Sequence, residues 1–180
     1  MKTLIVFDGT EQSVQNLQAA LNRTEPEATL KIPILELLPE DAPLDDYLAD
    51  MEERGLEYYK FIRQTVDQSG FPDALLEIWQ GLEPEATQMV AHRATSWEAE
   101  LIYVPLGKPC YICQETQYHG KLGFGHKKPL EESEPFTALV NPNSLSRMVN
   151  CPVAVTCHGD TILVLRNYLP ESGRAEKFAS

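Results

Sequence analysis

Short apolar runs alternate along the chain with segments whose apolar residues recur at helical spacing. The apolar runs are rich in β-branched residues and predict strands, which span residues 3–7, 29–38, 74–79, 100–104, 152–156 and 161–166. Apolar residues at helical spacing predict one helix after residue 10, a second from Leu44 to Val66 and a third from Ala86. A short fourth helix is predicted at residues 144–149. Within the second run, Pro33 lacks the N–H group of a regular strand residue, so we expect a bulge or an edge position there.

Strands that alternate with helices predict an α/β domain with a central parallel sheet, because each parallel crossover must be long enough to carry a helix. The turn signal His158-Gly159-Asp160 predicts that the last strand returns antiparallel as a hairpin. We expect one domain over residues 1–170, an insertion with little periodicity at 105–142 and a flexible tail at 171–180. Ligands of such sheets bind beyond the carboxyl ends of the strands, which directs attention to Asp8-Gly9-Thr10 and to Leu35-Glu36.

Composition and charge narrow the classes of function. The 180 residues are 43% hydrophobic and carry 27 acidic against 15 basic side chains, a formal charge of −12. This balance disfavours nucleic-acid partners and anionic membranes, both of which attract basic surfaces. No apolar run approaches the length of a membrane span and the first residues do not resemble a signal peptide, so we expect a cytoplasmic protein with thiols or metal ligands rather than disulfides.

Three segments together resemble the universal stress protein family. The opening Leu4-Ile5-Val6-Phe7-Asp8-Gly9-Thr10-Glu11-Gln12-Ser13 is similar to that family's first strand and its Asp-Gly-Ser-Glu-x-Ser turn. Residues 81–86 followed by 99–104 resemble its Gly-x-Pro-x-x-Ala helix start and Ala-Asp-Leu-Ile strand. Residues 143–155 are similar to its Gly-Ser-Val-Ser helix and Cys-Pro-Val strand. The resemblance implies a doubly wound, mostly parallel five-stranded sheet, here with an added antiparallel strand, and a homodimer.

The resemblance also implies a nucleotide site that this chain matches only in part. The residues that it places at an ATP site are Asp8, Gly9, Thr10, Leu35, Gly107 and Ser144. The phosphate loop of the ATP-binding members departs here, because Pro105 and Lys108 stand where its leading glycines would be and Asn143-Ser144 replaces its Gly-Ser pair. A side chain at those places blocks the close backbone approach that lets amide groups cradle a phosphate. We therefore expect a degraded ATP loop.

The insertion carries chemistry of its own. Two thiols and two imidazoles, the ligands that tetrahedral zinc prefers, are present at Cys110, Cys113, His119 and His126. The same residues allow a thiol-redox role, and the glycine-rich, cationic stretch 120–128 allows a substitute phosphate contact. A solvated loop whose glycines only permit turns is the plain alternative.

No nucleophile elbow, His-Glu-x-x-His pair or paired catalytic carboxylates occur, so we do not expect an enzyme. The first hypothesis is a universal-stress-protein-like signalling or stress-response module that binds a small ligand or an unknown protein partner. A zinc-binding or thiol-redox protein that uses residues 105–128 is the alternative. An ATP-binding protein with a substitute phosphate loop is the second alternative.

Overall fold

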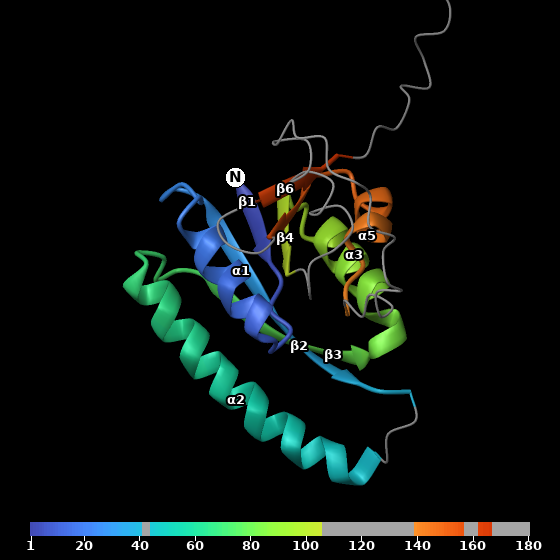
Figure 1. Ribbon diagram of the computed structural model, residues 1–180. Coiled ribbons are helices and arrows are strands. Elements are labelled where there is room, and N and C mark those ends of the chain that lie inside the picture. Colours follow the sequence, from blue (N-terminus) through green and yellow to red (C-terminus); the bar gives the residue numbers. More distant parts are fainter. Residues whose placement is uncertain (41–43, 106–138, 157–161, 167–180) are drawn as a thin grey trace, which may run out of the picture.

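The computed structural model describes residues 1–40, 44–105, 139–156 and 162–166. These residues form strands alternating with helices, as the pattern predicted (Figure 1). In chain order the elements are β1 (Lys2–Ile5), α1 (Glu11–Leu21), β2 (Thr29–Leu38), α2 (Leu44–Gln68), β3 (Leu75–Leu82), the 3-10 turn η1 (Glu83–Glu85), α3 (Ala86–Ser96), β4 (Leu101–Pro105), α5 (Pro142–Met148), β5 (Val153–Thr156) and β6 (Ile162–Leu165).

The strands form one six-stranded sheet in the order β3-β2-β1-β4-β5-β6. Every neighbouring pair is parallel except β5 and β6, which are antiparallel, with Val153 opposite Leu165 and Thr156 opposite Ile162. The predicted α/β class, the mostly parallel sheet and the added antiparallel strand are thus confirmed. The chain winds outward in one direction through β1, β2 and β3 and in the other through β4 and β5, so the strand order reverses between β1 and β4.

The expectation for Pro33 is wrong. β2 lies inside the sheet, between β1 and β3, and it keeps one register along its length, since Leu4 pairs with Lys31 and Phe7 with Ile34. The ladder between β1 and β2 is interrupted at the proline, while β2 pairs with β3 from Lys31 to Leu38 without a break. Because β3 holds β2 on the other side, the missing N–H group costs one ladder bond without shifting the strand.

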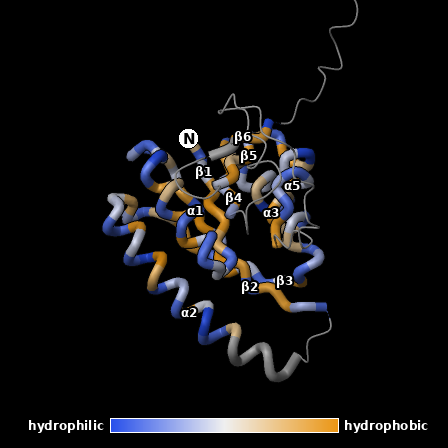
Figure 2. The backbone as a smooth tube through the Cα atoms, in the orientation of Figure 1, coloured by the Kyte–Doolittle hydropathy of each residue, from blue (hydrophilic) through white to orange (hydrophobic). Residues whose placement is uncertain are grey.

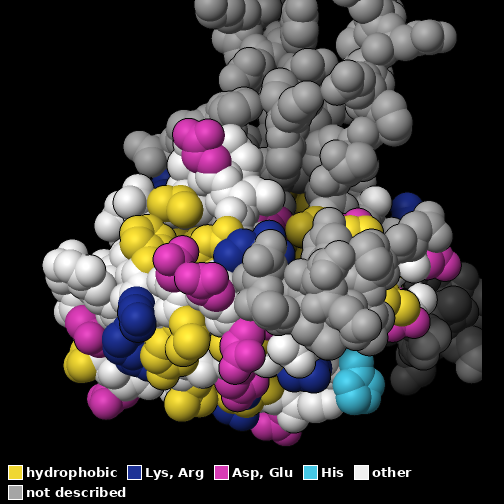
Figure 3. All heavy atoms as spheres, turned by 90° about the horizontal axis from the view of Figure 1, so that it is seen from below, with side chains coloured by type: hydrophobic (Ala, Val, Ile, Leu, Met, Phe, Trp, Pro, Cys, Tyr) yellow, Lys and Arg dark blue, Asp and Glu magenta, His cyan; other side chains and the backbone are white. Residues whose placement is uncertain are grey.

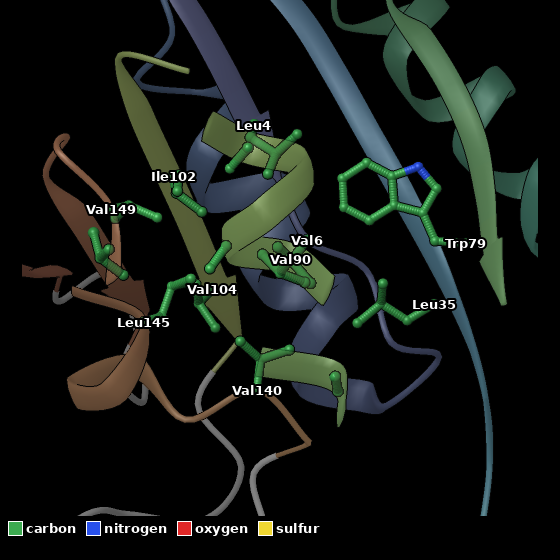
Figure 4. Close-up of a cluster of buried hydrophobic side chains, with 14 of the residues drawn as sticks. Leu4, Val6, Leu35, Trp79, Val90, Ile102, Val104, Val140, Leu145 and Val149 are labelled. Atoms are coloured by element: carbon green, nitrogen blue, oxygen red, sulfur yellow. The ribbon is translucent and has the colours of Figure 1, made fainter. Parts of the chain in front are cut away.

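Helices cover both faces of the sheet. α1 and α2 contribute Leu17, Ala20, Ile62 and Val66 to one buried cluster, together with sheet residues such as Phe7. α3 and α5 contribute to the cluster on the other face, where Val90 and Leu145 point toward Leu4, Ile102 and Val104 of the sheet (Figure 4). The hydrophobic stretches of the backbone accordingly follow the strands and the sheet-facing sides of the helices (Figure 2).

No helix of the described ranges is long and apolar enough to cross a membrane. The long helix α2 instead carries charged residues on its outer side and runs diagonally beneath β2 and β3 (Figure 1). Its described amino-terminal half lies over the carboxyl ends of β1 and β2, where Met51 and Gly55 are buried. This crossing positions the candidate site.

Candidate functional site

The turn after β1 is ordered by its own side chains. Oδ1 of Asp8 accepts hydrogen bonds from the backbone N–H of Thr10 at 3.1 Å and from its hydroxyl at 2.6 Å. Thr10 is in turn the N-cap of α1, with its Oγ1 accepting from the N–H of Ser13 at 3.2 Å. Gly9 has a φ of +79°, which side chains other than glycine rarely adopt, and this allows the sharp exit from the sheet. The sequence Asp-Gly-Thr therefore fixes a carboxylate at the end of the first strand.

A pocket of about 170 Å³ opens beside this turn. It lies between the carboxyl ends of β1 and β2 on one side and α2 on the other. Among the described residues, those that line it are Asp8, Leu35, Glu36, Leu37, Met51, Arg54, Gly55, Tyr58, Glu83 and Leu139. Its walls thus combine apolar side chains with three carboxylates and one guanidinium.

Glu36 has an unusual environment for a carboxylate. Its side chain points to the α2 side of the sheet, the residue is only 7% exposed, and its Oε2 accepts a hydrogen bond from Nε2 of Gln80 at 3.0 Å. Its Oε1 is buried and has no hydrogen-bond partner among the described residues. That oxygen lies against Gly55 of α2 so closely that a Cβ atom at residue 55 would collide with it. A buried carboxylate oxygen without a donor costs more free energy than a neutral unpaired group.

Tyr58 closes the pocket toward the turn. Its hydroxyl donates to the backbone oxygen of Gly9 at 3.4 Å, and its ring meets the ring of Phe7 edge-on with centroids 5.4 Å apart. A Cβ atom at residue 9 would lie 2.9 Å from the Tyr58 ring, so the close approach also requires glycine there. The turn after β1 and helix α2 are therefore packed together at the rim of the pocket.

The start of α5 is capped by its own side chain. Oδ1 of Asn141 accepts from the N–H of Ser144 at 3.0 Å, and Pro142 at the first helical position has no N–H to offer. The backbone N–H of Asn141 donates to Oγ1 of Thr87 on α3 at 3.0 Å. The N–H groups of Asn141 and Ser144 thus donate hydrogen bonds within the chain, and Pro142 has no N–H group.

Two further clefts, each of about 270 Å³, lie at the opposite, amino-terminal end of the strands. One is formed by residues 26–30 and 70–74, and the other by residues of α3 and the segment before β5. Both are larger than the pocket at Asp8, yet neither lies where open α/β sheets bind their ligands. The pocket at Asp8 also differs from these clefts because its lining includes Glu36. Among the described side chains, the buried polar atoms without a hydrogen-bond partner are Oε1 of Glu36 and the hydroxyl oxygen of Thr3.

The structure brings together some of the residues that the sequence singled out. Asp8 and Leu35 line the same pocket, and Gly9 and Thr10 form the turn at its edge. Ser144 lies at the start of α5 and does not line this pocket. The remaining candidates lie outside the described residues, namely Gly107, Cys110, Cys113, His119 and His126.

Sequence reasoning pointed to the segment Leu35-Glu36 but missed the part that α2 plays. Gly55 and Tyr58 gave only a weak signal, a glycine and an aromatic residue within a helical pattern. An acid inside the apolar run 29–38 was the stronger signal, because a charge there must find a partner or a ligand.

Among the described residues, no group of three or more His, Cys, Asp or Glu side chains is arranged to hold a metal ion. Cys151 is the free thiol of this part of the chain, and burial raises the pKa of its side chain. A raised pKa leaves little thiolate near neutral pH, so this thiol is a poor nucleophile.

Comparisons with known proteins bear on the fold. No protein-family model matches the sequence, and no curated protein matches it. Among solved structures, the universal stress protein UspA from Lactobacillus plantarum is 14% identical with a TM-score of 0.54, over 87% of this chain and 97% of that one. A universal stress protein in complex with cAMP is also 14% identical with a TM-score of 0.54, over 88% of this chain and 98% of the other.

A universal stress protein from Archaeoglobus fulgidus DSM 4304 is 15% identical with a TM-score of 0.54, and the likeness covers 87% of this chain and 50% of that one. At such identities the likeness concerns the fold. The chain therefore has a divergent form of the universal stress protein fold, and the resemblance inferred from its motifs is confirmed at that level.

Proposed function

We propose that this chain is a non-catalytic, universal-stress-protein-like signalling or stress-response module of the cytoplasm that binds a small ligand in the pocket between β1, β2 and α2. The observation that carries this proposal is the pocket itself, lined by Asp8 and Glu36 at the carboxyl ends of two adjacent parallel strands. Ligands of open α/β sheets bind at this end of the strands.

The chemistry of the lining residues supports binding rather than catalysis. Catalysis by a nucleophilic hydroxyl or thiol needs a base beside that group. The lining residues that the structure describes include no serine, cysteine or histidine, and the hydroxyl of Tyr58 faces the backbone oxygen of Gly9. Oδ1 of Asp8 is already engaged by Thr10 in a turn, a role that holds the loop in place.

The start of α5 supports a degraded phosphate loop. A phosphate at a helix start needs free backbone N–H groups that point at it. Here the N–H of Ser144 is taken by the side chain of Asn141, and residue 142 is proline. A ligand of this protein is therefore proposed to bind without a triphosphate held at α5.

The test is native mass spectrometry of the full chain, purified without denaturation, compared with its denatured mass. We expect an excess mass that corresponds to a small organic molecule, and we expect Asp8→Ala to reduce its occupancy because the turn at the pocket is lost. Asp73→Ala, which changes an exposed aspartate at the other end of the sheet, is the matched control and should retain the ligand.

The alternatives predict different masses. An excess of one ATP would favour the nucleotide-binding alternative with a substitute phosphate contact, and an excess of one zinc ion would favour a site at Cys110, Cys113, His119 and His126. A chain that carries no small molecule and gains none from added nucleotides, cAMP included, would contradict the proposed function.

A further inference from the structure

Strand β3 forms one edge of the six-stranded sheet, and no described strand pairs with its outer side (Figure 1). Its eight residues pair with β2 without a break, so the backbone is regular along the whole edge. The outward N–H and C=O groups of such a strand form a template that another strand can extend. The other edge of the described sheet is β6, which has four residues. The edge of β3 is therefore the longer of the two.

The side chains of β3 do not protect this edge from pairing. Natural sheets protect an edge strand with lysine, proline, a bulge or an unpaired charge. The sequence of β3 contains no lysine, arginine or proline, and its one acid, Glu77, is held by Nζ of Lys31 at 2.7 Å. Leu75, Ile78 and Leu82 are instead exposed by 46%, 41% and 38%. Such a sequence is typical of a strand that pairs with another strand.

One side of α2 continues the apolar surface beside β3. Arg63 identifies this side of the helix, because its guanidinium donates to the backbone oxygens of Pro72 and Ala74, just before β3, at 3.0 and 2.9 Å. Tyr59 and Leu56 lie one and two turns before Arg63 on the same side, and both side chains are exposed. Five of the nine exposed large hydrophobic side chains among the described residues thus lie on β3 or on this side of α2.

The edge of β3 is complementary to a second copy of itself. A two-fold axis uses the same surface on both subunits, and directly opposite residues of antiparallel strands have side chains on the same face. Ile78 faces α2, where its Cδ1 lies against Gly55. Pairing that places Ile78 opposite Ile78 of the second copy therefore brings both α2 helices to one face of the joined sheet. It also places Glu77 opposite Trp79, so no two like charges on the strands face each other.

We propose that β3 and the adjacent side of α2 bind a second copy of this chain, with the two β3 strands antiparallel. Burial of the exposed apolar side chains and pairing of the backbone groups of both edges favour the dimer. The inference goes beyond the proposed ligand binding and assigns a surface to the homodimer that the sequence predicted. Three exposed acids, Glu52, Glu53 and Glu57, lie near Leu56 on α2, so the copies also repel each other and added salt should strengthen the dimer.

Sedimentation velocity of the full chain at several concentrations tests the dimer. We expect wild type to form dimers that dissociate on dilution and tighten with added sodium chloride. Ile78→Glu places two carboxylates against each other at the centre of the strand pair, and Leu56→Glu adds an acid to the α2 surface. Because like charges that face each other across an interface oppose binding, each substitution should raise the dissociation constant about tenfold or more.

Each variant has a matched control with the same change of charge. Val164→Glu alters a half-exposed residue of the opposite edge strand, β6, and Met148→Glu alters a half-exposed residue of helix α5. Both controls should leave the dissociation constant unchanged. The thermal unfolding curve of each variant shows whether it is folded, and Leu56→Glu, at an exposed helix position, keeps the test valid if Ile78→Glu does not fold.

Amide hydrogen exchange distinguishes a second copy from another segment of the same chain. If a second copy covers β3, exchange in residues 75–82 slows as the protein concentration rises, and Leu56→Glu removes this dependence. Slow exchange of β3 in a chain that stays monomeric would show that its own chain covers the edge, and would overturn the inference. A monomeric wild type, or folded variants at Ile78 and Leu56 that dimerise as wild type does, would also overturn it. None of these results bears on ligand binding in the pocket between β1, β2 and α2.

Discussion

Gly55 lies within the long helix α2, and its missing side chain gives the Glu36 carboxylate its place against the helix backbone. A Cβ atom at residue 55 would collide with Oε1 of Glu36 and approach Cδ1 of Ile78 at 3.5 Å. Glycine in a helix interior otherwise destabilises the fold relative to alanine. The residue is therefore explained by the pocket rather than by the helix.

This contact predicts an unusual response to Gly55→Ala. In a helix interior this substitution ordinarily raises the free energy of unfolding by about 1 kcal/mol. Here the displaced Glu36 carboxylate should cancel or reverse that gain. In the Glu36→Ala background the collision is gone, so the ordinary gain should return. Urea denaturation of the four proteins measures the coupling, and the same gain in both backgrounds would show that residue 55 and Glu36 do not interact.

Glu77 on β3 predicts a dependence of stability on pH. The hydrogen bond from Lys31, whose Nζ lies 2.7 Å from Oε1 of Glu77, holds the pKa of this carboxyl below its ordinary value of 4.5, and the indole N–H of Trp79 contributes in the same direction. Because the pKa is lower in the folded chain than in the unfolded chain, the ionised form stabilises the fold above pH 4.5. That stabilisation is lost as the pH falls through the folded pKa.

Glu77→Gln should therefore reduce the loss of stability below pH 4.5. The side chain of Glu77 is 42% exposed, so solvent screening keeps the expected difference below about 1 kcal/mol. The measurement is the urea midpoint as a function of pH, with Glu25→Gln as the control on an exposed acid. Parallel curves for wild type and Glu77→Gln would refute the assignment.

Strand β6 occupies an edge of the sheet and so affects how two copies of the chain could associate. It pairs antiparallel with β5 and covers the edge through which a second copy would otherwise extend the sheet. Val164 on β6 is 48% exposed, whereas Leu165 packs against the core cluster beneath α3 and α5. Two copies of this fold therefore cannot pair through the edge of β5 while β6 is in place.

Truncation after Thr156 tests the role of β6. We expect the shortened chain to lose about 1 kcal/mol of stability from the exposed apolar contact of Leu165 and to associate through the edge of β5. Sedimentation velocity at several concentrations measures the association. Truncation after Arg166, which keeps β6, is the control, and equal association of the two shortened chains would show that β6 does not protect the edge.

The elements themselves were largely predictable from the sequence, because short apolar strands and amphipathic helices have distinct periods. β2 has the predicted bounds of residues 29–38, and β5 and β6 form the predicted antiparallel pair. The place of Pro33 was not predictable, because a central strand tolerates one missing ladder bond only when its other neighbour holds the register. That condition depends on β3, more than forty residues away along the chain.

The site was predictable only in part, for the same kind of reason. The convergence of Asp8 and Leu35 follows from two adjacent parallel strands ending at one edge of the sheet. The wall of the pocket that Gly55 and Tyr58 form depends on how α2 crosses that edge of the sheet, and no local sequence pattern predicts this crossing. The lack of a hydrogen-bond donor for Oε1 of Glu36 likewise could not be predicted, because it depends on the residues that pack around it in the folded chain.

The whole molecule combines an acidic surface with a pocket at one end of its sheet. Hydrophobic and charged side chains of both signs are interleaved on the face seen from below, so its described part carries no large patch of a single kind (Figure 3). The formal charge of −12 is unevenly distributed along the chain, because residues 36–57 contain nine acidic side chains against Arg54 alone, and the described lining of the pocket contains three carboxylates and one guanidinium. Recognition by this protein is therefore expected to be local, at the carboxyl ends of β1 and β2.

The most direct test of the central claim is amide NMR of the ¹⁵N-labelled full chain against a library of single-ring fragments, with cationic, neutral and anionic members. We expect the fragment-induced shifts to cluster on the backbone amides of Gly9, Thr10, Gly55 and Tyr58, around the pocket. The larger cleft between residues 26–30 and 70–74 serves as the internal comparison. Shifts that cluster at that cleft, or the absence of a cluster at the pocket, would show that the pocket between β1, β2 and α2 is not the ligand site.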